Sequence, residues 1–323
     1  YGADATRWYL LTNASPWDSL RFDQEGIKEA QRKIFNTLYN TYGFFALYAN
    51  VDGFAFREAA IPLAERPELD RWILSSLHSL VANVRQLMDE YEPTRAGRLI
   101  DEFVDTQLSN WYVRLCRRRF WKGEYEQDKI SAYQTLYECL LVVSKLIAPF
   151  SPFFSDWLYR NLNEVSGLEA ASSVHLCDFP VPESTRIHTA LEEKMKWAQD
   201  VSSLLLSLRK KATIKVRQPL QKAIIPLMDP AMRSRLEGVE DIILHEVNLK
   251  ELEWIPGDNQ LIQKKIKPNF KVAGTRFGAR MKAVAADVAT FTQEEIRQLE
   301  QDGKLLRIIQ HEEILIQRDD VEI

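Results

Sequence analysis

Apolar residues recur every three or four positions through the first half of the chain. This spacing is typical of amphipathic helices, and it predicts helices over residues 3–13, 26–48, 68–91, 95–121, 128–146 and 154–162. Short breaks, several of them containing proline, separate these segments. Because helices joined by short connections pack against their sequence neighbours, the pattern predicts an antiparallel helical bundle.

The pattern changes after residue 175. An exposed connection over residues 172–184 carries Pro180 and Pro182, and a long helical pattern follows over residues 187–211. Strand-like runs at 222–227, 249–255, 266–272 and 314–321 then alternate with helical patterns at 231–237, 241–246, 273–287 and 293–301. We therefore predict a mainly α fold with two domains. Residues 1–180 form a helical bundle with a short N-terminal segment, and residues 185–323 form a smaller α+β domain opened by the long helix, whose strand order the periodicity leaves open.

The composition is that of an ordinary soluble globular protein, with 46% apolar and 27% charged residues and a net charge of −4. No apolar run reaches the length of a membrane span, and no signal peptide is recognisable. The three cysteines, Cys116, Cys139 and Cys177, form no Cys-x-x-Cys pair. They fit buried thiols in a reducing cytoplasm better than disulfides or a zinc site, so we expect a cytoplasmic protein with no membrane partner.

Positive charge is concentrated in three windows that contain no Asp or Glu. The first lies between Asp105 and Glu124 and holds Arg114, Arg117, Arg118, Arg119 and Lys122, interleaved with Trp111, Tyr112, Phe120 and Trp121. Arginine binds phosphate through two N–H groups and stacks on bases, so the five basic residues and Trp111 are candidate nucleic-acid contacts. The simpler alternative stays open: the arginines are solvated or paired with carboxylates, and the aromatic residues belong to the core.

The other two windows lie in the second half of the chain. Their candidate contacts are Arg209, Lys210, Lys211, Lys215 and Arg217 in one window and Lys264, Lys265 and Lys267 in the other. In an acidic chain, three such windows mean that the charge is segregated, which is typical of nucleic-acid-binding surfaces. The alternative is that each window is a solvated face whose acidic partners are distant in sequence.

Motifs for bond-making chemistry are missing from the sequence. It contains no Gly-x-x-x-x-Gly-Lys or Gly-x-Gly-x-x-Gly loop, no Gly-x-Ser-x-Gly elbow, and no pair of histidines four residues apart. The stretch from Gly274 to Gly278 is a candidate anion-binding turn, although a plain turn between helices explains it as well. We therefore predict no catalytic residue, no metal ligand and no cofactor in this chain.

Four stretches resemble the C-terminal part of the isoleucyl-tRNA synthetases, a family of class I aminoacyl-tRNA synthetases. They are residues 1–11, residues 32–46, residues 109–119 with their Asn-Trp-Tyr-Val-Arg run, and residues 210–220 with their Lys-Val-Arg-Gln-Pro-Leu run. The first three stretches have relatives among the valyl and leucyl enzymes, whereas the fourth is more specific to the isoleucyl enzymes. The opening residues resemble the segment just past that family's Lys-Met-Ser-Lys-Ser loop, which implies that the short N-terminal segment of the bundle contacts the stem of the tRNA. We therefore expect the chain to be a piece of a longer protein.

The resemblance implies a role in recognising the anticodon arm of an isoleucine tRNA. Catalysis with ATP and Mg²⁺ would lie on an N-terminal catalytic domain of the same chain, whose His-x-Gly-His and Lys-Met-Ser-Lys-Ser motifs are absent here. Some members carry a zinc site made of cysteines near the C-terminus, but no cysteine follows Cys177. We expect a monomer in which Arg114, Arg117, Arg118 and Arg119 contact the anticodon arm and Lys210, Lys211, Lys215 and Arg217 form a second patch.

Three other interpretations stay open. In the first, the chain is the anticodon domain of a valyl- or leucyl-tRNA synthetase. In the second, it is a helical scaffold whose arginines bind acidic protein partners. In the third, the last domain serves only for packing within the parent enzyme.

Overall fold

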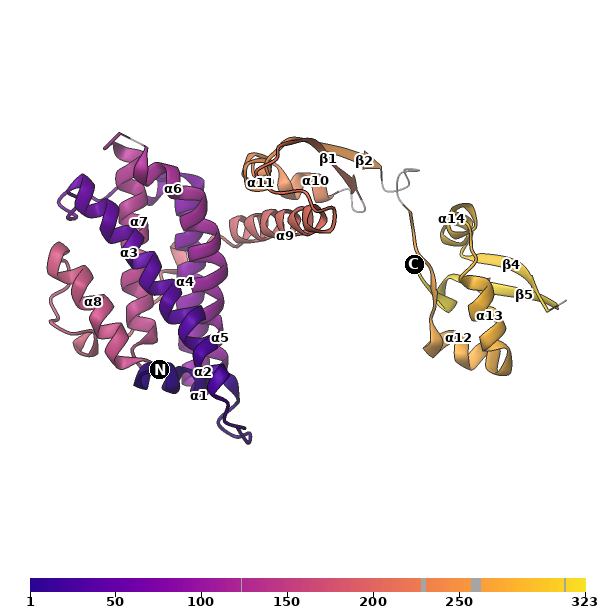
Figure 1. The fold of residues 1–323 in the computed structure, drawn as a ribbon, viewed down its shortest axis with the longest axis horizontal. Helices are drawn as coiled ribbons and strands as arrows, with labels where there is room; N and C mark the ends of the chain where they lie inside the picture. Colours follow the sequence, from indigo (N-terminus) through magenta and orange to yellow (C-terminus); the bar gives the residue numbers. More distant parts are fainter. Residues whose placement is uncertain (123, 228–230, 257–262, 311) are drawn as a thin grey trace. The chain divides into compact units, whose positions relative to one another are not determined.

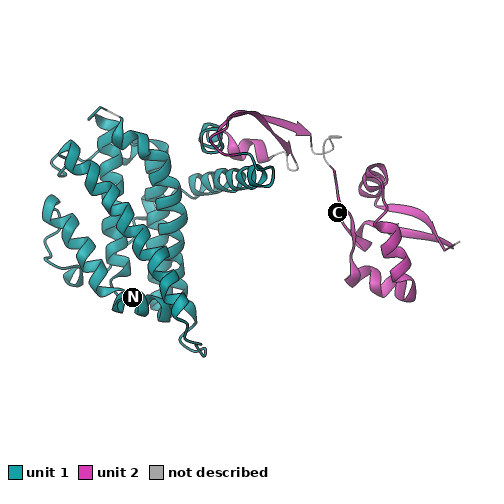
Figure 2. Ribbon diagram, in the orientation of Figure 1, with its two compact units in different colours: residues 1–214, 238–247 teal, residues 215–237, 248–323 magenta. Residues whose placement is uncertain are grey.

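The computed structural model describes the chain except for residues 123, 228–230, 257–262 and 311 (Figure 1). It divides into two compact units, drawn in different colours in Figure 2. Residues 1–214 and 238–247 form the first unit, and residues 215–237 and 248–323 form the second. The first unit is helical and the second combines helices with small sheets, which confirms the predicted mainly α fold class.

The first unit is built around long helices that lie side by side in Figure 1. Its helices are α1 (Ala3–Asn13), α2 (Gln24–Ala30), α3 (Asn36–Asp52), α4 (Glu68–Asp89), α5 (Pro93–Glu102), α6 (Arg114–Trp121), α7 (Gln127–Ile147), α8 (Pro152–Ser166), α9 (Thr189–Lys211) and α11 (Glu240–Val247). Helix α4 packs against α5 and α7, and α7 also packs against α3 and α8. Each helix predicted in this half is present, because the apolar spacing marks the face that the bundle buries.

Proline and glycine fix several helix ends. Pro93 and Pro152 occupy the first turns of α5 and α8, where the missing N–H removes no helical hydrogen bond. Helices α3 and α8 end at Gly53 and Gly167, whose φ angles of 71° and 63° lie in the left-handed region that glycine adopts without strain.

Two segments predicted as uniform helices contain π-helical turns. Between α5 and α6 the helix continues through η3 (Phe103–Val113), and between α2 and α3 it continues through η1 (Gln31–Phe35). A π-turn closes a hydrogen bond over five residues, one more than an α-turn. The η3 segment still buries an apolar stripe, including Phe103, Leu108 and Trp111, against α3 and α4.

Helix α9 belongs to the first unit by its contacts, whereas the sequence pattern assigned it to the second domain. It packs against α4 and against α11, which returns to this unit from later in the chain. The buried residues of α9 include Met195, Ala198 and Val201. The compact units therefore divide the chain at residue 214 rather than near residue 180.

The second unit contains three two-stranded sheets and four helices among its described residues. Strand β1 (Leu220–Leu227) pairs in parallel with β2 (Leu249–Pro256), with Leu220 opposite Leu249. Strand β4 (Lys304–Ile309) pairs antiparallel with β5 (Glu312–Gln317), and β3 (Lys267–Pro268) pairs antiparallel with β6 (Val321–Glu322). The helices are α10 (Ala231–Leu236), α12 (Phe270–Phe277), α13 (Met281–Val288) and α14 (Gln293–Asp302).

The predicted strand over residues 266–272 is wrong. Only Lys267 and Pro268 pair as a strand, because Asn269 then caps helix α12 by accepting a hydrogen bond from the Lys271 N–H. The predicted run over residues 314–321 is interrupted by a turn of 3-10 helix, η7 (Arg318–Asp320). Strand β4 was not predicted at all.

A separate apolar core lies in the C-terminal part of the second unit. It is formed mainly by residues from α13, α14, β4 and β5, among them Val288, Leu299, Leu305, Ile314 and Ile316. Within the described part of the chain, no helix has the length and apolar character needed to cross a bilayer.

Candidate nucleic-acid interface

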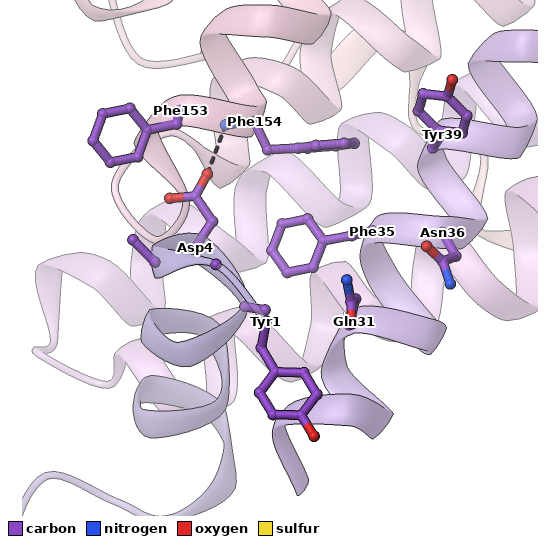
Figure 3. Close-up of a pocket in the computed structure, with 11 residues that line it drawn as sticks. Tyr1, Asp4, Gln31, Phe35, Asn36, Tyr39, Phe153 and Phe154 are labelled. Atoms are coloured by element: carbon purple, nitrogen blue, oxygen red, sulfur yellow. Dashed lines mark hydrogen bonds between the residues drawn. The ribbon is translucent and has the colours of Figure 1, made fainter. Parts of the chain in front are cut away.

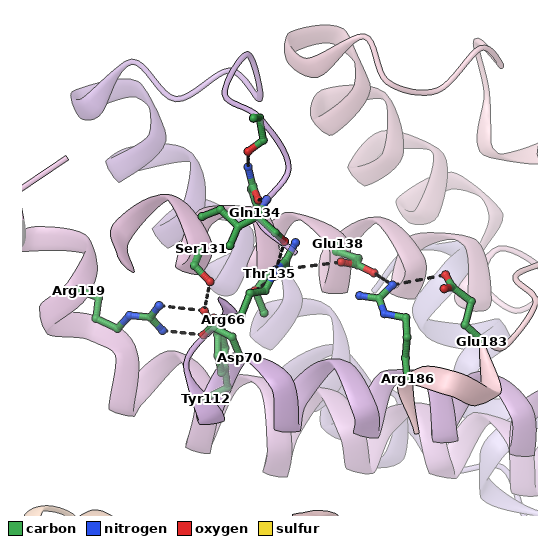
Figure 4. Close-up of polar contacts among 12 residues, drawn as sticks. Arg66, Asp70, Tyr112, Arg119, Ser131, Gln134, Thr135, Glu138, Glu183 and Arg186 are labelled. Carbon is green, nitrogen blue, oxygen red and sulfur yellow. Dashed lines mark hydrogen bonds and ion pairs between the residues drawn. The ribbon is translucent and has the colours of Figure 1, made fainter. Parts of the chain in front are cut away.

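Arg119 belongs to a polar network inside the bundle that converges on Asp70 (Figure 4). Its Nη1 and Nη2 atoms donate to the two carboxylate oxygens of Asp70, at 2.6 and 2.9 Å, and its Nε atom donates to Asp128 at 2.9 Å. Tyr112 and Ser131 also donate to Asp70, at 2.8 and 2.6 Å. Asp70 is fully buried. Arg119 therefore neutralises a buried carboxylate and ties α6 to α4 and α7.

Burial of this network also makes its neighbours chemically inert. Desolvation, aided by the charge of Asp70, raises the pKa of the Tyr112 hydroxyl well above its usual range. Desolvation raises the pKa of the Cys116 thiol to about 12. Both groups stay protonated at neutral pH, so neither is an activated nucleophile.

A second, partly buried network joins the bundle to the connection before α9 (Figure 4). Arg186, in the turn η5 (Ser184–Arg186), donates to Glu138 at 2.6 Å, and Arg66 lies 3.8 Å from the other oxygen of Glu138. Arg66 also donates to Thr135 at 2.9 Å. These charges are compensated within the bundle, so they serve the fold.

Arg114 forms an ion pair with Glu246 of helix α11. The Glu246 side chain is 6% exposed and that of Arg114 is 44% exposed. Burial raises the pKa of the Glu246 carboxyl, and the positive charge of Arg114 acts against that increase. Arg114 thus holds α11 on the bundle while part of its side chain stays in solvent.

The remaining basic residues of the first window stay on the surface. Arg117, Arg118 and Lys122 are exposed, and neither arginine forms an ion pair with any residue that the structure describes. Trp121 is 57% exposed, and the Lys122 ammonium lies 5.4 Å from the centre of its ring. We call Arg117, Arg118, Trp121 and Lys122 the α6 patch. It combines three positive charges with an aromatic face, the combination that single-stranded nucleic acid binds.

The aromatic contact predicted from the sequence was Trp111, which lies in the core at 4% exposure. Tyr112 and Phe120 are fully buried as well. Trp121 lies in the same window but is not among the predicted contacts. The three-and-four spacing through Leu108, Trp111 and Leu115 gives no signal for it, because Phe120 departs from that spacing as well and is nevertheless fully buried.

The second basic window is divided between the two units. Arg209 is buried on α9 at 4% exposure, whereas Lys210 and Lys211 are exposed in its last turn. Lys215 and Arg217 are exposed residues of the second unit.

The third basic window, in the second unit, is only partly available. Lys264 pairs with Glu300, while Lys265 and Lys267 are exposed. Arg276 pairs with Asp320 and donates to the Leu315 carbonyl at 3.0 Å. The candidate anion-binding turn near Gly278 therefore has its central arginine occupied by a carboxylate.

A hollow in the first unit lies beside Tyr1 (Figure 3) and has a volume of about 450 Å³. Its wall includes Tyr1, Phe35, Tyr39 and Phe153. Its one carboxylate, Asp4, accepts a hydrogen bond from the Phe154 N–H at 2.6 Å. Among the described residues, no group of three His, Cys, Asp or Glu side chains is arranged to hold a metal ion.

Residues 70–224 match the family model of the anticodon-binding domain of tRNA ligase. The matched region begins at Asp70 and contains the α6 patch. Over all 323 residues, the chain is 53% identical to the isoleucine–tRNA ligase of Bacteroides thetaiotaomicron and 52% identical to that of Cytophaga hutchinsonii. This chain belongs to the isoleucine–tRNA ligase family. It spans 28% and 29% of the lengths of those two isoleucine–tRNA ligases.

A more distant isoleucine–tRNA ligase, from Dehalococcoides mccartyi, is 48% identical over 252 residues, which are 78% of this chain and 25% of that ligase. A solved LeuRS–tRNA–LeuAMS complex from Agrobacterium radiobacter resembles 58% of this chain, with a TM-score of 0.40 and 18% identity, and the match covers 20% of the solved chain. That likeness is too weak to carry a functional argument.

Proposed function

We propose that this chain is the part of an isoleucine–tRNA ligase that binds the anticodon arm of isoleucine tRNA. The observation that carries the proposal is that the family match and an exposed basic surface fall on the same residues. The anticodon-binding family match over residues 70–224 contains a surface where Arg117, Arg118 and Lys122 are exposed and the two arginines have no carboxylate partner among the described residues. The parent enzyme would use ATP and Mg²⁺ to join isoleucine to its tRNA on a catalytic domain outside this chain.

In the proposal, the predicted contacts have two different roles. Arg117, Arg118 and Lys122 neutralise phosphates of the anticodon arm, which fixes its position without reading its sequence. Lys210, Lys211, Lys215, Arg217, Lys265 and Lys267 are exposed and extend the basic surface within their own units. Arg119, Arg209 and Trp111 act through the fold, since they are largely withdrawn from solvent, and Arg114 and Lys264 are engaged by carboxylates.

The remaining expectations belong to the parent enzyme. We propose that it works as a monomer in the cytoplasm, and the three free cysteines of this chain support the reducing compartment. Any zinc in the parent would be held outside the described residues of this chain, which offer no site for it.

The test is a titration of the 323-residue chain with isoleucine tRNA at several salt concentrations. Binding through phosphates releases counterions, so the logarithm of the affinity should fall linearly with the logarithm of the salt concentration. The Arg117→Ala/Arg118→Ala variant should reduce the magnitude of that slope by roughly one unit per lost phosphate contact. The matched control is Arg160→Ala/Lys196→Ala, which removes the same charge from side chains that are 66% and 67% exposed on α8 and α9.

Equal slopes for the wild-type chain and the Arg117→Ala/Arg118→Ala variant would remove these two residues from the interface. Competition among isoleucine, valine and leucine tRNAs distinguishes an isoleucine-specific anticodon domain from a valine- or leucine-specific one. If the chain is instead a scaffold for acidic proteins, its binding should survive nuclease treatment and should show no preference among tRNAs.

A further inference from the structure

We propose that Trp121 is a stacking platform for one unpaired base of the anticodon loop. This inference rests on the proposed function and assigns to the tRNA-binding surface a base contact, in addition to its phosphate contacts. Nucleotides in RNA loops are unstacked from the helix and are commonly held against aromatic side chains.

The surroundings of Trp121 distinguish it from other exposed aromatic residues. Tyr39 is also 57% exposed, but its ring stacks on Trp157 with centroids 5.6 Å apart. The Trp121 ring has no aromatic partner among the described residues, and the exposed Arg117 and Arg118 precede it by one helical turn. A single exposed tryptophan would need no explanation. A ring without an aromatic partner, preceded by two arginines without a carboxylate partner among the described residues, offers both the stacking face and the charges that a loop nucleotide requires.

The ring is presented from a backbone that the core holds in place. Phe120 is fully buried and packs edge-to-face against Phe44 and Tyr133, with centroids 5.1 and 5.0 Å apart. Arg119 is held by Asp70. The two residues before Trp121 are therefore fixed, which lowers the entropic cost of binding a base on the ring.

Lys122 leaves room for only one stacked base. Its ammonium lies over the Trp121 ring, 5.4 Å from the centroid, in the geometry of a cation–π contact. One face of the indole is thus covered by a positive charge, while the other face remains for a base. Arg117 and Arg118, one helical turn before Trp121, supply positive charge for the phosphate of that nucleotide. The site fits a nucleotide rather than a neutral aromatic molecule.

Stacking and phosphate binding differ in their response to salt, and this difference defines the experiment. A stacked base releases no condensed counterions, so Trp121→Ala should weaken binding of the 323-residue chain to isoleucine tRNA by about 5- to 150-fold at every salt concentration, with an unchanged slope. Trp121→Phe keeps an aromatic face and should recover most of the affinity. Trp17→Ala is the matched control, because Trp17 is 76% exposed on the loop between α1 and α2.

A second RNA locates the contact. An isolated anticodon stem-loop should show the Trp121→Ala loss, whereas the same stem closed by a stable tetraloop should bind wild type and variant equally. Full affinity of Trp121→Ala, or an equal loss on both RNAs, would overturn the stacking role. If Arg117→Ala/Arg118→Ala still lowers the salt slope in that case, the proposed function stands and only this inference fails. A wild-type chain that binds no tRNA would overturn both.

Discussion

Asp70 holds Arg119, one of the arginines of the first basic window, inside the bundle. It is fully buried, it accepts hydrogen bonds from Tyr112 and Ser131, and its charge is balanced by the two N–H groups of Arg119. Removing one member of such a pair leaves the other charge buried without compensation, which costs far more than the pair contributes when it is intact.

We therefore expect Asp70→Asn to lower the free energy of unfolding by about 3–5 kcal/mol, measured by urea denaturation. Asp128→Asn is the control, because Asp128 also contacts Arg119 but is 60% exposed, so its loss should cost less than about 1 kcal/mol. Similar losses for the two variants would show that Arg119 does not depend on Asp70 for compensation.

The candidate site shows what a sequence window reveals and what it conceals. The absence of acids between Asp105 and Glu124 correctly marks a stretch with unpaired arginines at its surface, namely Arg117 and Arg118. It conceals the carboxylates that arrive from elsewhere, since Asp70 lies 49 residues before Arg119 and Glu246 comes from α11. These carboxylates reach their arginines only in the folded chain, so no pattern within the window predicts the ion pairs.

At the scale of elements, periodicity predicts the helices of the bundle because one face of each helix is buried. It fails at residues 266–272, where Ile266, Pro268, Phe270 and Val272 alternate as in a strand. Phe270 and Val272 are 66% and 43% exposed, so no buried face maintains the alternation, and the Asn269 cap starts a helix instead. Strand β4 escaped prediction for a related reason. Leu305 and Ile309 are buried, whereas Leu306 and Ile308 are exposed although they are apolar. The sequence therefore shows a continuous apolar run in place of the alternation of apolar and polar residues that predicts a strand.

Close contact between α1 and α2 depends on Gly26. A Cβ atom at Gly26 would lie 2.3 Å from Cε2 of Tyr9, and the Tyr9 hydroxyl is fixed by donating to the Arg21 carbonyl and accepting from the Asp23 N–H. Gly26→Ala should therefore reduce the free energy of unfolding by about 1–3 kcal/mol. Gly43→Ala, in the open interior of α3, should instead raise it by about 0.5–1 kcal/mol. Thermal unfolding of both variants measures the contrast, and equal shifts would contradict the packing argument.

At the scale of the whole molecule, a net charge of −4 coexists with segregated basic surfaces, and two units carry separate cores. The total charge therefore says little about partners, because electrostatic binding depends on local surfaces and not on the sum of all charges.

Separate cores imply separate unfolding transitions. Calorimetry of the 323-residue chain should show two transitions rather than one. Leu136→Ala in α7 and Leu299→Ala in α14 each empty a fully buried position, at a cost of about 2–5 kcal/mol, and each should move only the transition of its own unit. A single transition that both substitutions lower would mean that the units unfold together.

The wide turns of η3 have a consequence for insertions and deletions. Successive residues of an α-helix are offset by about 100° around its axis. A π-turn holds one residue more than an α-turn, so loss of one residue from the 11-residue η3 segment can be absorbed when one of its turns rewinds as an α-turn. Arg119 would then stay beside Asp70, whereas the same deletion inside α4, an uninterrupted α-helix, would turn everything after it by that angle. A one-codon deletion in η3 should therefore be tolerated where a deletion in its neighbour is not.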